Sequence, residues 1–88
     1  MAKHALRFSR AAIKEAEKLP NQVAARVALA IDRLAEDQRP IGSRKLQNEE
    51  DLWRLRVGDY RIIYEINGVE RIVYIRRIRH RREVYRDI

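Results

Sequence analysis

Arginines that alternate with apolar residues along three short segments are the side chains best placed to do chemistry. Residues 52–57, 60–66 and 69–78 are rich in β-branched and aromatic residues, a composition typical of strands. The dipeptides between them, Gly58-Asp59 and Asn67-Gly68, favour two-residue hairpin turns. A strand places successive side chains on opposite faces of its sheet. We therefore expect one apolar face and one face that gathers arginines.

Two-residue turns would also determine which residues lie opposite one another. Across the first turn, Arg56 would pair with Arg61. Across the second turn, Arg61 would pair with Tyr74, and Ile66 would pair with Val69. The apolar face would then carry Trp53, Leu55, Val57, Tyr60, Ile62, Tyr64, Val73 and Ile75. The opposite face would carry Arg54, Arg56, Arg61, Tyr74 and Arg76. Guanidinium groups form paired hydrogen bonds with phosphate and carboxylate oxygens, so this face is a candidate phosphate-binding surface.

Basic residues dominate the composition, and most of them are arginines. The 88 residues carry a net charge of +7, with 16 arginines and only 4 lysines. Five of the seven residues from Arg76 to Arg82 are arginine. A run of like charge is often a solvated tail, but this run continues directly from a strand-like segment. We therefore expect a polyanionic partner, either a nucleic acid or an acidic protein segment.

Cleavage of RNA without a metal ion has three chemical requirements, and the sequence offers candidate residues for each. A base must help to deprotonate the attacking 2′-hydroxyl, an acid must protonate the leaving 5′-oxygen, and positive charge must stabilise the phosphorane. Arg61 suits the third role, unless it is solvated or paired with an acid such as Glu65. His80 suits proton transfer near neutral pH, or it is structural. Tyr85 is placed either to stack on an unpaired base or to close the core. Candidate bases are Glu49, Glu50 and Asp51.

Several other classes of function find no support in this sequence. Cysteine is absent, and the two histidines, His4 and His80, lie at opposite ends, so we expect no metal site and no cofactor. The longest apolar run, residues 27–31, is far too short to span a bilayer. The first ten residues lack the apolar stretch of a secretory signal. We expect a cytoplasmic protein that does not enter a membrane.

The first half of the chain reads as scaffold for the arginine-bearing strands. Residues 4–8 suit a short edge strand, and Ser9 is a plausible N-cap for a helix with Ala12, Ile13 and Ala16 on one side. Leu19-Pro20 should interrupt that helix, because the residue before proline avoids the helical region. A second helix is expected from residue 20 or 21 to about 37, with an apolar stripe of Val23, Val27, Ala30, Ile31 and Leu34.

These elements predict a single small domain over residues 1–88. Residues 43–51 are polar and are predicted to form a loop. The order is a strand, two helices and then a β-meander. The predicted class is α+β, with an N-terminal helical hairpin packed on the apolar face of a small antiparallel β-sheet.

Two segments of the second half carry a resemblance to a known family. The string RLRVGDYRIIYEI, followed after a hairpin by VYIRRIRHRREVYR, resembles the toxins of the RelE/ParE superfamily. The two helices before it are similar to that family's N-terminal hairpin. The resemblance implies a fold like that of microbial RNases. It also implies cleavage of messenger RNA in the ribosomal A site by 2′-hydroxyl attack, which leaves a cyclic phosphate and a free 5′-hydroxyl.

The resemblance also implies roles for individual residues. Arg61 matches the central phosphate-stabilising arginine, Arg79 the basic residue after the last strand, and Tyr85 the C-terminal tyrosine that stacks on or protonates the substrate. His80 looks like the histidine that some branches use as general acid. Arg54 matches a basic position on the preceding strand, and the arginines expected to bind substrate with it are Arg56, Arg76 and Arg81. Better-known ribonucleases have a lysine where this chain has Leu52, so the proton-abstracting group is not assigned.

The family resemblance further implies a partner and leaves alternatives open. The partner would be a cognate antitoxin encoded in the same operon. The leading interpretation is a ribosome-dependent mRNA endoribonuclease, favoured by the joint presence of Arg61, Arg79, His80 and Tyr85. One alternative is the ParE branch, which inhibits DNA gyrase and does not cleave RNA. Another is a catalytically inactive module that binds a nucleic acid or an antitoxin.

Overall fold

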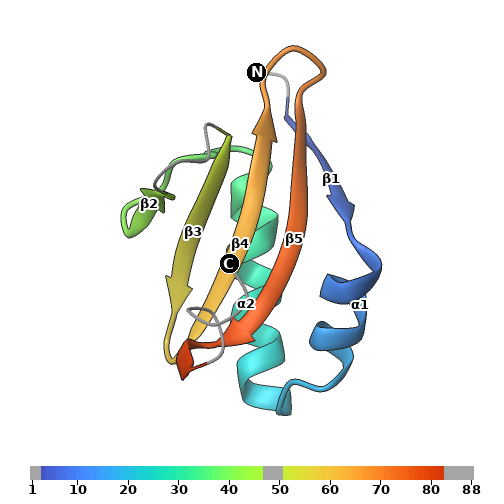
Figure 1. Ribbon diagram of the computed structural model, residues 1–88, viewed down its shortest axis with the longest axis vertical. Helices are drawn as coiled ribbons and strands as arrows, with labels where there is room; N and C mark the ends of the chain where they lie inside the picture. Colours follow the sequence, from blue (N-terminus) through green and yellow to red (C-terminus); the bar gives the residue numbers. More distant parts are fainter. Residues whose placement is uncertain (1–2, 47–50, 83–88) are drawn as a thin grey trace.

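Two helices cover one face of a five-stranded sheet in the computed structural model, which describes residues 3–46 and 51–82 (Figure 1). The helices are α1 (Arg10–Glu17) and α2 (Asn21–Leu34). The strands are β1 (Ala5–Phe8), β2 (Ser43–Lys45), β3 (Leu52–Val57), β4 (Tyr60–Asn67) and β5 (Ile72–His80). Their order in the sheet is β1-β5-β4-β3-β2. The predicted α+β class is confirmed, although the sheet is mixed because β1 runs parallel to β5.

The helical hairpin begins and breaks where the sequence predicts. The Ser9 hydroxyl accepts a hydrogen bond from the Ala12 N–H at 3.0 Å and caps α1. The second helix starts directly after Pro20 but ends at Leu34, three residues before the predicted end. Ile13 is 49% exposed, so it does not join the packed side of α1 that was expected for it.

The core lies between the helices and the apolar face of the sheet. Its helical members are Ala12, Val27, Ile31 and Leu34, and its strand members are Leu55, Ile62, Tyr64, Ile66, Val73, Ile75 and Ile78. Each large aliphatic side chain buried here stabilises the fold by about 1.5–3 kcal/mol. Trp53 packs at the margin of this core, and the Arg39 guanidinium lies 5.2 Å from its ring centroid. The predicted apolar face is therefore confirmed for most of its members.

The first hairpin has the predicted register, but the second does not. Arg56 lies opposite Arg61 across the turn that contains Gly58, whose φ is +59°. After Asn67, by contrast, the connection to β5 is a four-residue loop over residues 68–71. The positive φ in this loop belongs to Arg71, at 58°, and not to the Asn-Gly pair. Ile66 consequently lies opposite Val73 and not opposite Val69.

A β-bulge in β5 shifts the register once more. Tyr64 lies opposite Ile75, whereas the preceding residue, Ile63, lies opposite Arg77. Arg76 is therefore the extra residue of the bulged strand. Counting without this extra residue would place Ile78 opposite Arg61. With it, Arg79 lies opposite Arg61, and the predicted pairing of Arg61 with Tyr74 is wrong.

The segment predicted as a loop before β3 contains a short strand. Residues Ser43–Lys45 form β2 and pair in antiparallel fashion with β3, with Arg44 opposite Arg54. The polar composition of this segment fits an edge strand, because one of its sides faces no further strand. Glu49 and Glu50, two of the candidate bases, lie outside the described residues.

Tyr64 provides a test of this packing. Its hydroxyl donates a hydrogen bond to the Gln38 carbonyl at 2.8 Å, and burial raises its pKa from 10.0 to about 12. We expect Tyr64→Phe to lower the free energy of unfolding by about 1 kcal/mol at neutral pH, because it leaves an unpaired acceptor. The protonated tyrosine is favoured in the folded state, so its contribution is complete below pH 10 and is lost as the pH rises towards 12.

Urea denaturation across pH 8–12 would check this prediction. The wild type should lose stability more steeply than Tyr64→Phe above about pH 10. Tyr74→Phe, at a 39% exposed tyrosine, serves as the control and should follow the wild type. Parallel pH profiles for the wild type and Tyr64→Phe would contradict the buried position of this hydroxyl.

Candidate functional site

The sheet face turned away from the helices carries two cross-strand rows of basic side chains. One row consists of Arg56, Arg61 and Arg79, and the other contains Arg54, Ile63 and Arg77. In Figure 1 the helices lie behind the sheet, so this face points towards the viewer. We call it the arginine face and define it by Arg54, Arg56, Arg61, Arg77 and Arg79. Four of the predicted site residues, Arg54, Arg56, Arg61 and Arg79, are brought together on it.

Arg61 is the residue around which this face is organised. It is 8% exposed and is the one charged residue that is buried among those the structure describes. Its Nη1 donates a hydrogen bond to the Tyr60 carbonyl at 3.2 Å. Within residues 3–46 and 51–82, no carboxylate forms an ion pair with it. A buried charge is costly unless it is paired, and guanidinium cannot lose its proton, so an anion bound here would stabilise the site.

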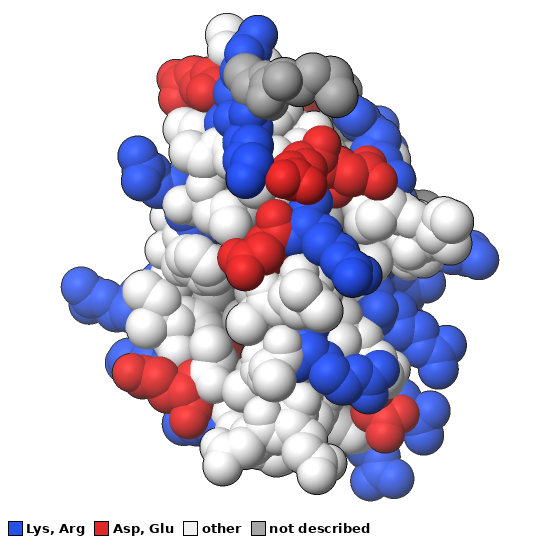
Figure 2. Space-filling model, turned by 180° about the vertical axis from the view of Figure 1, so that it is seen from behind, with Lys and Arg blue, Asp and Glu red and all other residues white. Residues whose placement is uncertain are grey.

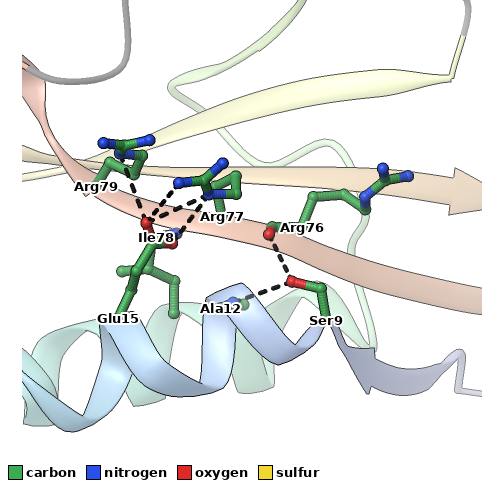
Figure 3. Close-up of polar contacts among 7 residues, drawn as sticks. All are labelled: Ser9, Ala12, Glu15, Arg76, Arg77, Ile78 and Arg79. Carbon is green, nitrogen blue, oxygen red and sulfur yellow. Dashed lines mark hydrogen bonds and ion pairs between the residues drawn. The ribbon is translucent and has the colours of Figure 1, made fainter. Parts of the chain in front are cut away.

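Arg79 and Arg77 are held from the side by Glu15 of α1 (Figure 3). The carboxylate lies 3.0 Å from Nη2 of Arg77 and 3.5 Å from Nε of Arg79. It also accepts the Ile78 backbone N–H at 2.8 Å. Sequence reasoning missed Glu15. The available signal was an acidic residue between Ala12 and Ala16, on the side of α1 that packs against β5.

His80 lies on the other side of the sheet from the arginine face. It is opposite Tyr60 on β4, one residue beyond the Arg61–Arg79 pair, so its side chain alternates to the helix-covered side. Its ring packs edge-on against Tyr60, with centroids 5.3 Å apart. Its Nδ1 accepts the Arg82 N–H at 3.3 Å. This geometry favours packing against Tyr60 over contact with a phosphate at Arg61.

The other predicted site residues are spread around the arginine face. Arg76, at the bulge, forms an ion pair with Glu65 at 2.9 Å. Arg81 follows β5 and is exposed, and its backbone N–H donates to the Asp59 carbonyl at 2.7 Å. Asp51 is exposed and directly precedes β3. Tyr85 lies outside the described residues.

A groove opens on the opposite, helix-bearing side, between α2 and β3. It has a volume of about 330 Å³, and its apolar lining includes Leu29, Ala30, Ile41, Leu55 and Val57. Ile41 is fully exposed and Leu29 is half exposed. Arg26 and Arg33 of α2 also line the groove, and Arg56 borders it although its row in the sheet belongs to the arginine face. Figure 2 shows this side, where uncharged surface is interrupted by acidic and basic side chains in the upper half and basic side chains project along both margins.

The described residues contain neither a cluster of metal ligands nor a membrane-spanning helix. No group of three or more His, Cys, Asp or Glu side chains within these ranges is arranged to hold a metal ion. None of the helices described is long and apolar enough to cross a membrane.

Comparisons with known proteins match both the sequence and the fold. Residues 6–85 match the family model of the ParE toxin of type II toxin–antitoxin system, parDE. Toxin RelE3 of Methanocaldococcus jannaschii is 28% identical over 82 residues, which cover 89% of this chain and 91% of the relative. The RelE–RelB complex of Pyrococcus horikoshii OT3 matches with a TM-score of 0.80 and 26% identity, over 90% of this chain and 96% of that chain. The toxin–antitoxin complex RelBE2 of Mycobacterium tuberculosis matches with a TM-score of 0.78 and 26% identity, over 89% of this chain and 98% of that chain.

The fold and the family match together define a class of protein. The chain is a toxin of a type II toxin–antitoxin system with a RelE-like α+β fold. It belongs to the ParE toxin family, within the RelE/ParE superfamily. The resemblance that the sequence motifs indicated is thereby confirmed.

The burial of Arg61 generates a prediction that needs no RNA. Burying a charge is costly, so Arg61→Met, which puts an apolar side chain of similar length in its place, should raise the free energy of unfolding by about 1 kcal/mol. Inorganic phosphate at constant ionic strength should stabilise the wild type more than the variant, because a ligand stabilises the state that binds it. Thermal unfolding with and without phosphate would measure both effects. Arg10→Met, at an exposed arginine of α1, is the control. A variant that is less stable, with an unchanged response to phosphate, would contradict an anion site at Arg61.

Proposed function

We propose that this toxin is a metal-independent mRNA endoribonuclease that acts in the cytoplasm on messenger RNA in the ribosomal A site. The observation that carries the proposal is the burial of Arg61 between Arg56 and Arg79, on the face away from the core. Like charges directly opposite one another destabilise a sheet. A phosphate bound across this row would relieve the repulsion, and guanidinium groups suit its geometry.

The chemistry follows from placing the scissile phosphate at this row. The 2′-oxygen forms a bond to phosphorus and loses its proton, while the bond to the 5′-oxygen breaks and that oxygen gains a proton. The products are a 2′,3′-cyclic phosphate and a free 5′-hydroxyl. Arg61 and Arg79 stabilise the charge that develops on the phosphorane, which is the largest single contribution in many such reactions. In the proposal, the ribosome orients the mRNA so that the 2′-oxygen lies in line with the leaving group.

The partner of this toxin is proposed to be a cognate antitoxin that docks in the groove between α2 and β3. The apolar lining fits one face of an amphipathic segment, and the arginines at the groove fit acidic residues beside that face. The similar chains from Pyrococcus horikoshii OT3 and Mycobacterium tuberculosis were solved as complexes with an antitoxin, which supports the proposal. Such a segment would order on binding.

A second candidate function is inhibition of DNA gyrase without RNA cleavage. The match to the ParE toxin model is the observation that favours it, because the ParE branch is the gyrase-directed branch of the superfamily that the sequence resembles. Fold alone does not separate the two activities, because they share the same scaffold.

Loss of Arg61 tests the proposed activity directly. Arg61→Ala should reduce cleavage of ribosome-bound mRNA by roughly 10²–10³, because it removes one donor to the phosphorane. Arg10→Ala changes an exposed arginine that is distant from Arg61 in the sequence, and this variant should cleave like the wild type. Primer extension would map the cuts, and a supercoiling assay with purified gyrase would run beside it. Undiminished cleavage by a folded Arg61→Ala protein would exclude the assignment of Arg61, and gyrase inhibition without cleavage would favour the second candidate.

The same reactions distinguish the two candidate proton donors. If His80 protonates the leaving oxygen, His80→Gln should lose the limb of the pH–rate profile that reports an imidazole. The packing of His80 against Tyr60 predicts an unchanged profile with a modest loss of rate. Tyr85→Phe would then test the hydroxyl of Tyr85. If Tyr85→Phe is as inactive as Tyr85→Ala, the hydroxyl is the donor; if only Tyr85→Ala is impaired, Tyr85 stacks on the base.

The groove makes a prediction about the antitoxin. Ile41→Glu should weaken its binding by roughly 10-fold or more, because the substitution places negative charge beside an acidic segment and removes an apolar contact. Binding to the wild type should also weaken as salt rises. Titration calorimetry with the purified antitoxin would measure both. Ile13→Glu, at a half-exposed isoleucine outside the groove, is the matched control. Equal affinities for the two variants would place the antitoxin elsewhere.

A further inference from the structure

Glu15 connects the helix layer to the arginine face through one carboxylate. Its Oε1 accepts the Ile78 N–H at 2.8 Å, and its Oε2 lies 3.0 Å from Nη2 of Arg77 and 3.5 Å from Nε of Arg79. Figure 3 shows the three contacts converging on the carboxylate from β5. The side chains are 21% exposed for Glu15 and 14% exposed for Arg79. The backbone contact fixes the carboxylate, and the carboxylate in turn restrains the two guanidinium groups.

Closing the edge of β5 does not by itself require a charged residue. Pairing of β1 with β5 ends at Phe8 and Ile75, so the next part of this edge faces α1. The Ser9 hydroxyl, which is uncharged, meets that edge by donating to the Arg76 carbonyl at 2.6 Å. Glu15 likewise forms a hydrogen bond with the backbone of this edge, at Ile78, and it also forms ion pairs with Arg77 and Arg79 of the arginine face. The charge of Glu15 therefore acts on Arg77 and Arg79.

We propose that Glu15 is a positioning residue that holds Arg79 beside Arg61 for binding the scissile phosphate. The inference rests on the proposed function. Glu15 lies 3.5 Å from Nε of Arg79, and Arg79 lies opposite Arg61 in the sheet, so the ion pair restrains the guanidinium beside Arg61. An arginine side chain has many rotamers, and ordering it before the substrate arrives lowers the barrier of the chemical step. Glu15 itself takes no part in proton transfer.

The substitution Glu15→Gln separates positioning from edge closure. The amide oxygen still accepts the Ile78 N–H, whereas the negative charge that holds the arginines is lost. We expect kcat for cleavage of ribosome-bound mRNA to fall roughly 10- to 100-fold, with KM for the programmed ribosome nearly unchanged. Glu36→Gln is the matched control, because it makes the same change of charge at the exposed Glu36–Lys3 pair. It should cleave like the wild type. Equal kcat values for Glu15→Gln and Glu36→Gln would overturn the proposal.

A double mutant tests whether Glu15 acts through Arg79. In an Arg79→Ala background, Glu15→Gln should have no further effect on kcat, because the side chain that it positions is gone. Additive effects of the two substitutions would overturn the proposal and assign Glu15 a role independent of Arg79. Thermal unfolding of each variant would show that the losses are not losses of fold.

If Glu15→Gln fails to fold, an NMR measurement on the wild type alone tests whether Glu15 restrains Arg79. In ¹⁵N relaxation, Nε of Arg79 should show a high order parameter, because the ion pair with Glu15 restrains the side chain; the low order parameter of a flexible side chain would overturn the proposal. Failure of the proposed function is recognised separately. A wild type that leaves ribosome-bound mRNA intact would overturn the nuclease activity and with it the role of Glu15 in catalysis. A wild type that cleaves, with a Glu15→Gln variant that cleaves equally well, would overturn the role of Glu15 alone.

Discussion

The extra residue in β5 decides which side chains share a face beyond the bulge. Up to Ile75 the strand follows the register set by the four-residue loop, and from Arg77 onwards it is shifted by one residue. A one-residue shift exchanges the two faces of a strand. Because of it, Arg79 and not Ile78 lies opposite Arg61, while Ile78 enters the core. Both the arginine face and the last part of the hydrophobic core therefore depend on this bulge.

Contacts from α1 and its N-cap residue meet β5 at and directly after the bulge. Ser9 contacts the carbonyl of the extra residue Arg76, and Glu15 contacts the N–H of Ile78 two residues later. The helix thus supplies the hydrogen bonds that β1 no longer provides along this edge, in keeping with the rule that backbone polar groups at a sheet edge find partners. In the case of Glu15 the same contact brings a carboxylate to two arginines. Edge closure and the arrangement of the arginine face are consequently one feature.

What the sequence predicted well was local, and what it missed depended on distant contacts. The Ser9 cap, the break at Pro20 and the Gly58-Asp59 turn are encoded by neighbouring residues, and all three are present. The Asn-Gly signal after β4 was misleading, because the loop closes with Arg71 in the left-handed region instead. The ion pairs of Glu15 join residues more than sixty positions apart. The bulge depends on the packing of β5. Arg54, Arg56 and Arg61 were placed on one face correctly, because they alternate along two strands joined by a local turn. The position of Arg79 opposite Arg61 depends on the bulge, and His80 lies on the other side of the sheet.

In the proposed reaction, the arginine face stabilises a phosphate that is attacked by the 2′-hydroxyl of the adjoining ribose. The most direct measurement uses ribosomes programmed with an mRNA that carries a single 2′-deoxynucleotide at the position cut in the all-ribose message. We expect the all-ribose message to yield a 2′,3′-cyclic phosphate and a 5′-hydroxyl, and the deoxy-substituted message to stay intact at that position. Cleavage of the deoxy-substituted message there, or no cleavage of either message by the folded toxin, would contradict the proposed reaction.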